Sequence, residues 1–142
     1  MNTPKVIVCE RSRKWSAALA RHLPAANALR QTRSLKEARA ELTNAPSSLL
    51  VLELTAENRW GVLALLSDLA EEFPLARAAV LAEADMKNHE WLMREAGASF
   101  FSASLRDAQQ LARLAERHLN EVAFPPSDLA AQIWDSLPWG EI

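Results

Sequence analysis

Cys9 is the chain's single cysteine, and it ends a short apolar run. A thiol becomes a nucleophile or redox sensor when a nearby positive charge lowers its pKa. Arg11 and Lys14 are close in sequence, but the carboxylates of Glu10 and Glu53 would raise that pKa. A small buried hydrophobic residue is therefore the favoured interpretation of Cys9. A lone cysteine also excludes an intramolecular disulfide and a metal site built from several thiolates.

The three histidines, His22, His89 and His118, each stand alone on a predicted helix without a second ligand at metal-binding spacing. We therefore predict no metal ligand and no catalytic base among them. On the last predicted helix, either His118 or Leu119 faces the core.

The three glycines are far apart in sequence, so no glycine-rich loop can hold a nucleotide. We expect no metal and no cofactor.

The composition is that of an ordinary globular domain: 142 residues, of which 49% are hydrophobic and 24% are charged. The formal net charge is −2, and the sixteen lysines and arginines are scattered, which gives no basic patch for nucleic acid. The first apolar run has about four residues, too few for a signal peptide or a bilayer span. We expect a cytoplasmic protein that binds neither nucleic acid nor membrane.

Five short runs, bounded by proline, charged or turn residues, are predicted to be strands. The apolar ones suit a parallel sheet that is covered on both faces. The run LLVLEL is the strongest and is predicted to be the central strand, whereas the second run is the weakest. The five ranges are 5–9, 27–31, 49–54, 78–82 and 99–102.

Helical periodicity separates these runs, because apolar residues recur three and four positions apart. Pro24, Pro74 and Gly97 end three of the segments. Ser34, with Glu37 three residues later, predicts a capping box at the start of another. The predicted helices span residues 12–23, 34–42, 60–73, 85–96 and 106–121.

Strand and helix alternate five times, which predicts an α/β fold. We expect a doubly wound, flavodoxin-like sheet of five parallel strands in the order 2-1-3-4-5, with helices on both faces. Residues 1–121 would form this domain, and residues 122–142 a C-terminal extension. The architecture alone names no function, so the site residues must indicate it.

The segment ELTAENRWG resembles the phosphorylation loop of the response-regulator receiver (CheY-like) family. In that family an aspartate ends the third strand, and a glycine eight residues later starts the third helix. Glu53 and Gly61 keep this spacing. The Gly97-Ala98 turn before two phenylalanines is similar to the family's turn into its fifth strand. The resemblance covers residues 4–120 and implies the receiver fold.

The resemblance also implies which positions would carry phosphoryl chemistry. Receivers use an acidic pair to hold Mg²⁺, an aspartate nucleophile, a hydroxyl residue after strand four and a lysine before a proline after strand five. By position these become the pair Cys9 and Glu10, then Glu53, Ala82 and Ser104. Of these positions, only Glu10 and Glu53 carry a carboxylate. The chain therefore resembles a degenerate pseudo-receiver that lacks the phosphorylation residues.

Three interpretations of Glu53 stay open. It binds Mg²⁺ weakly with Glu10 and a backbone carbonyl near Thr55; it mimics a phosphorylated aspartate; or it pairs with Arg11 or Arg59. The third is favoured, because the position that would sense a phosphate charge carries no hydroxyl. Phosphoryl transfer is not expected, since the extra methylene displaces the nucleophile and errors of about 1 Å can cost about a hundredfold.

The predicted fourth helix contains the run HEWLM. Receivers use the face formed by their fourth helix, fifth strand and fifth helix for protein docking and dimerisation. This implies that Trp91 and Met93 contact a protein partner, or a second copy of the chain in a homodimer. The helical spacing of Trp91, however, favours packing against the core with partial exposure.

The C-terminal extension is unexpected in a receiver. A Pro-Pro pair breaks the chain, and a serine-aspartate pair can cap a new short helix that contains tryptophan. Such an apolar segment is costly to leave exposed. The favoured alternative is that it folds back on its own domain or on a twin subunit; the other is that it docks in another protein's groove. The candidate contacts are Trp134, Leu137 and Trp139.

The chain keeps the spacing of the receiver loop but lacks the residues that carry phosphoryl chemistry. We therefore predict a non-catalytic, phosphorylation-independent module that binds proteins or regulates signalling. We do not expect an enzyme. The alternative is a residual metal-dependent or thiol-based enzyme or sensor that uses Glu10, Glu53 and Cys9.

Overall fold

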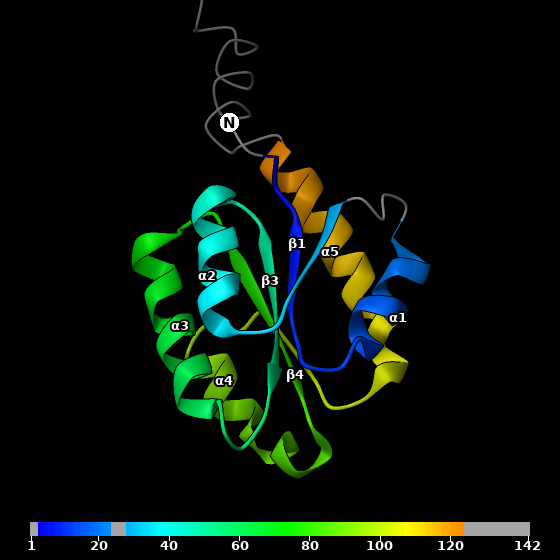
Figure 1. Ribbon diagram of the computed structural model, residues 1–142, viewed down its shortest axis with the longest axis vertical. Helices are drawn as coiled ribbons and strands as arrows, with labels where there is room; N and C mark the ends of the chain where they lie inside the picture. The colour runs from blue at the N-terminus through cyan, green and yellow to red at the C-terminus, as the bar shows by residue number, and fades with distance from the viewer. Residues whose placement is uncertain (1–2, 24–27, 124–142) are drawn as a thin grey trace, which may run out of the picture.

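The computed structural model describes residues 3–23 and 28–123, which form one parallel sheet between two layers of helices (Figure 1). The strand order β2-β1-β3-β4-β5 confirms the predicted doubly wound fold. The predicted helix of the extension and its contacts Trp134, Leu137 and Trp139 lie outside the described residues. The strands are β1 (Val6–Cys9), β2 (Leu29–Thr32), β3 (Leu49–Leu54), β4 (Arg77–Ala82) and β5 (Phe100–Ser102).

Helices α1 and α5 cover one face of the sheet, and α2, α3 and α4 cover the other (Figure 1). Two 3-10 segments, η2 and η3, lead directly into α4 and α5. The bounds are α1 (Lys14–His22), α2 (Leu35–Asn44), α3 (Arg59–Glu72), η2 (Ala84–His89), α4 (Glu90–Glu95), η3 (Leu105–Asp107) and α5 (Ala108–Ala123). Within the described ranges, no helix has the length and apolar character needed to cross a bilayer.

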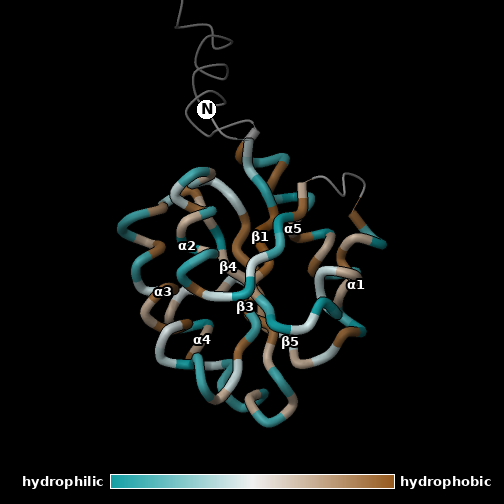
Figure 2. The backbone as a smooth tube through the Cα atoms, viewed as in Figure 1, coloured by the Kyte–Doolittle hydropathy of each residue, from teal (hydrophilic) through white to brown (hydrophobic). Residues whose placement is uncertain are grey.

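The strands divide their side chains between two apolar clusters, because successive residues of a strand point to opposite faces. In β1, Val6 and Val8 pack with α1 and α5, whereas Ile7 and Cys9 pack with α2 and α3. Figure 2 shows that hydrophobic residues are concentrated along the central strands. All six residues of β3 are buried, which explains why LLVLEL is the clearest strand signal in the sequence.

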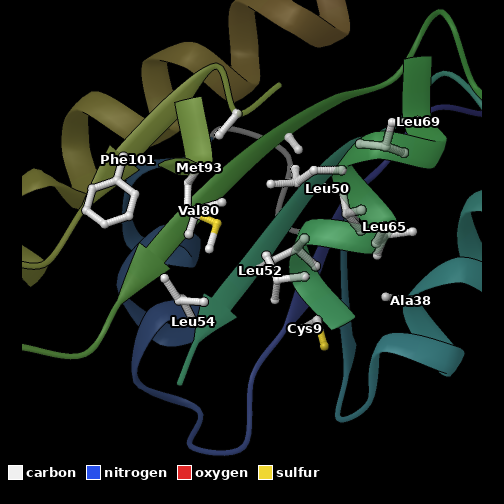
Figure 3. Packing of buried hydrophobic residues seen from close by; sticks show 14 of the residues in the cluster. Cys9, Ala38, Leu50, Leu52, Leu54, Leu65, Leu69, Val80, Met93 and Phe101 are labelled. Carbon is white, nitrogen blue, oxygen red and sulfur yellow. The ribbon is translucent and has the colours of Figure 1, made fainter. Parts of the chain in front are cut away.

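The helix predicted over residues 85–96 is two elements, because η2 precedes a six-residue α4. The first part has Asp, Asn and His, which are weak helix formers. Met86 in η2 and Met93 in α4 are both buried in the same cluster and hold the two pieces against the sheet. Figure 3 shows Met93 beside Val80 of β4.

Two predictions about α4 are wrong. Met93 was expected to contact a partner, but it is 0% exposed. Trp91 was expected to pack against the core, but it is 73% exposed. The two residues are two positions apart and therefore point to opposite sides of the helix. The outward side of α4 thus presents an indole to solvent.

The helix ends follow the predicted chemistry in part. The Ser34 hydroxyl accepts a hydrogen bond from the Glu37 amide at 3.1 Å, as in a capping box. The Glu37 carboxylate, however, accepts from the amide of Arg33 and not from that of Ser34. Gly97 follows α4 with φ of 122°, a value that favours glycine. On α5, His118 is the inward residue and is 1% exposed.

Candidate functional site

A pocket of about 250 Å³ opens at the carboxyl edge of the sheet, between the ends of β1 and β3 and the start of α2. The strand order reverses between β1 and β3, which is where doubly wound sheets hold ligands. This carboxyl-edge pocket brings together Cys9, Glu10 and Glu53, as their positions after neighbouring strands predicted. Its lining is Cys9, Glu10, Arg11, Arg33, Ser34, Leu35, Glu53, Thr55 and Asn58.

Glu10 caps α1 although it lies outside that helix. One carboxylate oxygen accepts from the amide of Trp15 at 3.0 Å. The other accepts from the amide of Ser16 at 2.7 Å and from its hydroxyl at 2.8 Å. The residue at the N-cap position, Arg13, makes no side-chain cap, so Glu10 supplies the acceptors that the first turn needs. Glu10 is 2% exposed, and both of its oxygens face the helix.

Glu53 is 8% exposed at the end of β3. Its carboxylate accepts a long hydrogen bond, 3.3 Å, from the backbone amide of Arg11. Among the described residues, no ion pair joins it to the guanidinium of Arg11 or Arg59. Arg59 instead places its guanidinium carbon 5.1 Å from the centre of the Trp60 ring. The expected arginine pairing is therefore replaced by a backbone contact that ties the β1–α1 loop to β3.

The loop from β3 to α3 is fixed by its own side chains. The Asn58 side-chain oxygen accepts from the Thr55 amide at 2.8 Å, and its nitrogen donates to the Glu53 carbonyl at 2.8 Å. The Thr55 hydroxyl accepts from the Asn58 amide. Side-chain bonds of this kind replace a regular turn. They hold the backbone after Glu53 in one conformation.

The fold is similar to the crystal structure of a response regulator from Thermotoga maritima, with a TM-score of 0.64 and 22% sequence identity. The match covers 84% of this chain and 100% of that chain. The chain has a receiver-like fold. No protein-family model matches the chain, and no curated protein matches its sequence. At 22% identity the similarity establishes the fold alone, so any activity has to be inferred from the site residues.

Two of the degenerate phosphorylation positions do not reach the carboxyl-edge pocket. Ala82 ends β4 beside Leu54, and its side chain is buried in the apolar cluster. Ser104 lies in the turn after β5, where its hydroxyl accepts from the Arg106 amide at 3.2 Å. In the receiver-like fold these positions therefore provide neither a hydroxyl nor a cation over Glu53.

The environment of Cys9 keeps its thiol protonated. Burial raises the pKa of Cys9 above the ordinary value of 9.0, and the carboxylates of Glu53, Glu37 and Glu10 raise it further, although a hydrogen bond with Thr32 acts in the opposite direction. The side chain is 5% exposed and packs with α2 and α3 (Figure 3). A reactive thiol needs access and a lowered pKa. The structure favours the predicted role as a small buried hydrophobic residue.

The carboxylate of Glu10, one of the candidate ligands for Mg²⁺, is already used to cap α1. Mg²⁺ is held through one or two carboxylates at near-octahedral geometry. The carboxylate of Glu10 already accepts three hydrogen bonds from α1, and the carbonyl of Glu53 accepts from Asn58. In the part of the chain that the structure describes, no three His, Cys, Asp or Glu residues are grouped so that they could hold a metal ion. The site is polar, but its polar atoms serve the neighbouring loops.

Proposed function

We propose that the protein is a non-catalytic, phosphorylation-independent receiver-like module that binds another protein in signalling. The observation that carries the proposal is the bonding of Glu10. Its two oxygens cap α1 through Trp15 and Ser16, so the surviving member of the acidic pair has a structural task. The carboxyl edge then keeps the receiver geometry without its chemistry.

The remaining positions support the same proposal. Phosphoryl transfer depends on positioned charge around the transferred group. Ala82 provides no hydroxyl, and Ser104 provides no cation and bonds within its own turn. Glu53 is one methylene longer than aspartate, and an error of about 1 Å can cost about a hundredfold in rate. Each missing part weakens catalysis independently.

The proposed contact with the partner is the outward side of α4. Trp91 is 73% exposed and Leu92 is 40% exposed, while the buried Met93 fixes the helix to the core. An exposed tryptophan on a rigid helix can supply much of the binding free energy of an interface. The charged pair Glu90 and Arg94, joined at 2.9 Å, borders this surface. We therefore propose a protein partner with an apolar pocket that accepts the indole of Trp91.

The absence of phosphorylation is tested by incubating the full chain with a small phosphoryl donor and Mg²⁺ and measuring the intact mass. We expect no added phosphate on the wild type or on Glu53→Asp, because restoring the aspartate does not restore the missing hydroxyl and cation. A phosphorylatable receiver in the same mixture is the positive control. An added phosphate on the wild-type chain would overturn the proposal.

The role of α4 is tested with two exposed tryptophans, since Trp60 at the start of α3 is 69% exposed. We expect Trp91→Ala to lose the partners captured by the wild type, and Trp60→Ala to keep them. Both variants should keep the wild-type unfolding midpoint, because neither side chain is in the core. Sedimentation of the same variants tests the homodimer expected through the face from α4 to α5. Equal capture by both variants would refute the α4 contact.

A further inference from the structure

An apolar groove of about 320 Å³ lies at the amino edge of the sheet, opposite the carboxyl-edge pocket. It runs between the end of α3 and the turn from α4 to β5, over the start of β4. Leu69, Phe73 and Pro74 form one wall, and Ala96 and Gly97 the other. This amino-edge groove exposes carbon surface that a soluble domain would gain free energy by covering.

The described chain ends at the same edge of the sheet as this groove, although α5 lies on the opposite face. Arg77, at the start of β4, lines the groove and is paired with Glu121 of α5 at 3.2 Å. Glu121 is two residues before the end of α5 at Ala123. Figure 1 shows the last turn of α5 at the end of the molecule where β1 and β3 begin. The end of α5 is therefore linked to the rim of the groove through the Arg77–Glu121 pair.

The residues that follow have a composition that suits the groove. Residues 124–142 contain two of the chain's five tryptophans and no lysine or arginine. Leu129, Ile133 and Leu137 are spaced by four, and Trp134 follows Ile133, so one side of a helix there would be apolar. The charged residue that lines the groove, Arg77, already pairs with Glu121, so the apolar side chains of the segment would have to supply the contact.

Reach does not limit this contact. An extended chain spans about 3.3–3.6 Å per residue, so the four residues before Asp128 can extend up to about 14 Å from Ala123. A short connection also gives the segment a high effective concentration at the groove, higher than that of a separate molecule. The cost of closing such a short loop is small.

We propose that residues 124–142 fold back and cover the amino-edge groove of their own domain, with Trp134 and Trp139 as the apolar anchors. The occupant is this chain's own C-terminal segment. The proposal concerns the end of the sheet opposite the carboxyl-edge pocket, and it does not depend on the function proposed above. It assigns a role to the part of the sequence that a receiver-like fold does not need.

Proximity is tested with a spin label at the rim of the groove in the full chain. Leu75 is 56% exposed between two lining residues, and Leu105 is 45% exposed in η3, at the carboxyl edge. Cys9 is buried, so a label reacts with the introduced thiol of Leu75→Cys or of the control Leu105→Cys. We expect the label at position 75 to broaden the indole N–H signals of Trp134 and Trp139, and the label at position 105 to leave them sharp. Unchanged tail signals with both labels would overturn the proposal.

Two matched substitutions on α3 test occupation of the groove. Ala70 and Ala64 are both exposed, but only Ala70 lines the groove. We expect Ala70→Arg to move the indole signals of Trp134 and Trp139 to the positions seen in an isolated 124–142 peptide, and Ala64→Arg to leave them in place.

A mixture of isotope-labelled wild-type chain and unlabelled, spin-labelled Leu75→Cys chain tests whether the segment in the groove belongs to the same chain or to a second copy. Broadening in that mixture would place a second copy's segment in the groove and overturn the proposal; sharp signals there, with broadening within one chain, support it.

Discussion

The two ends of the parallel sheet use their side chains differently. At the carboxyl edge, Glu10 and Glu53 accept hydrogen bonds from the backbone of the loop and helix that follow β1. At the amino edge, the described residues form a groove with a mostly apolar lining, at the same end of the sheet as the end of α5. The carboxyl edge is where a doubly wound fold places its chemistry. Here the carboxylates at that edge bond to the neighbouring loop and helix, and the described residues form a groove with a mostly apolar lining at the other end.

The contrast shows that polar residues at the usual ligand edge of such a sheet can stabilise the fold itself. A buried carboxylate that binds a ligand is a cost to stability until the ligand arrives. A buried carboxylate that caps a helix contributes to stability at all times. Glu10 is of the second kind, because its two oxygens accept hydrogen bonds from the first turn of α1.

The largest expected effect is at Glu10. Replacing it by alanine leaves the Trp15 amide and the Ser16 amide and hydroxyl without their acceptor near a buried helix end. Buried donors that lose their partner cost about 1–3 kcal/mol each, partly relieved by water and relaxation. We expect Glu10→Ala to lower the free energy of unfolding by about 3 kcal/mol in urea denaturation.

The control for this substitution is Glu57→Ala, since Glu57 is exposed in the loop after β3. It should change stability by less than about 0.5 kcal/mol. A stabilising Glu10→Ala substitution would contradict the comparison, because it would mark Glu10 as a strained carboxylate kept for a ligand.

At the opposite end, His118 links α5 to the loop before β3. Its Nε2 lies 2.8 Å from the Ser47 carbonyl and must donate to it, which leaves the buried Nδ1 unprotonated and without a hydrogen-bond partner among the described residues. Burial lowers the pKa of His118 from the ordinary 6.5, and the charge of Arg77 lowers it further, against the Ser47 bond and Glu121. The unfolded chain therefore takes up a proton first as pH falls. Stability should decrease below pH 6.5, by at most about 1.4 kcal/mol per pH unit for one proton.

The check is urea denaturation at a series of pH values on wild type and His118→Gln. Glutamine can still donate to the Ser47 carbonyl but does not titrate, so its stability should vary less between pH 7 and pH 5. His22→Gln, which replaces an exposed histidine, should keep the wild-type profile. Equal slopes for wild type and His118→Gln would show that another group causes the loss.

Much of the fold is readable from local patterns. The runs at β1, β3 and β4 are apolar throughout because both faces of those strands are covered, and this fixed their bounds to within a residue or two. The break between η2 and α4 was not predicted. Periodicity identifies which residues face the core, here Met86 and Met93, but not whether the backbone between them is α-helical or 3-10.

The sequence predicted which residues of the site lie close together, but not what each of them does. The carboxyl ends of neighbouring parallel strands must meet, so the proximity of Cys9, Glu10 and Glu53 follows from the strand order. The cap made by Glu10 was missed, because sequence rules look for the acceptor at the N-cap position, and here it comes from the end of β1. The choice of His118 over Leu119 was also open, since both fit the inward side of a helix.

Smaller changes in stability are expected at two glycines, one from each end of the sheet. Gly97, at the amino edge, has φ of 122°. An added Cβ would lie 3.8 Å from the Leu66 carbonyl oxygen, which is ordinary contact, so any cost comes from the backbone alone. We expect Gly97→Ala to lower the free energy of unfolding by about 1–2 kcal/mol.

Gly61, at the carboxyl edge, presents the reverse case. It lies within α3 and its φ is not positive, but an added Cβ would come 2.6 Å from a terminal carbon of Leu35. That carbon ends a flexible side chain and can move, while alanine in a helix gains roughly 0.5–1 kcal/mol over glycine. We expect Gly61→Ala to change the urea midpoint by the equivalent of less than about 0.5 kcal/mol. A loss as large as that of Gly97→Ala would mean that α2 and α3 cannot separate at this point. The glycine that keeps the receiver spacing would then be required for packing and would be more than a mark of resemblance.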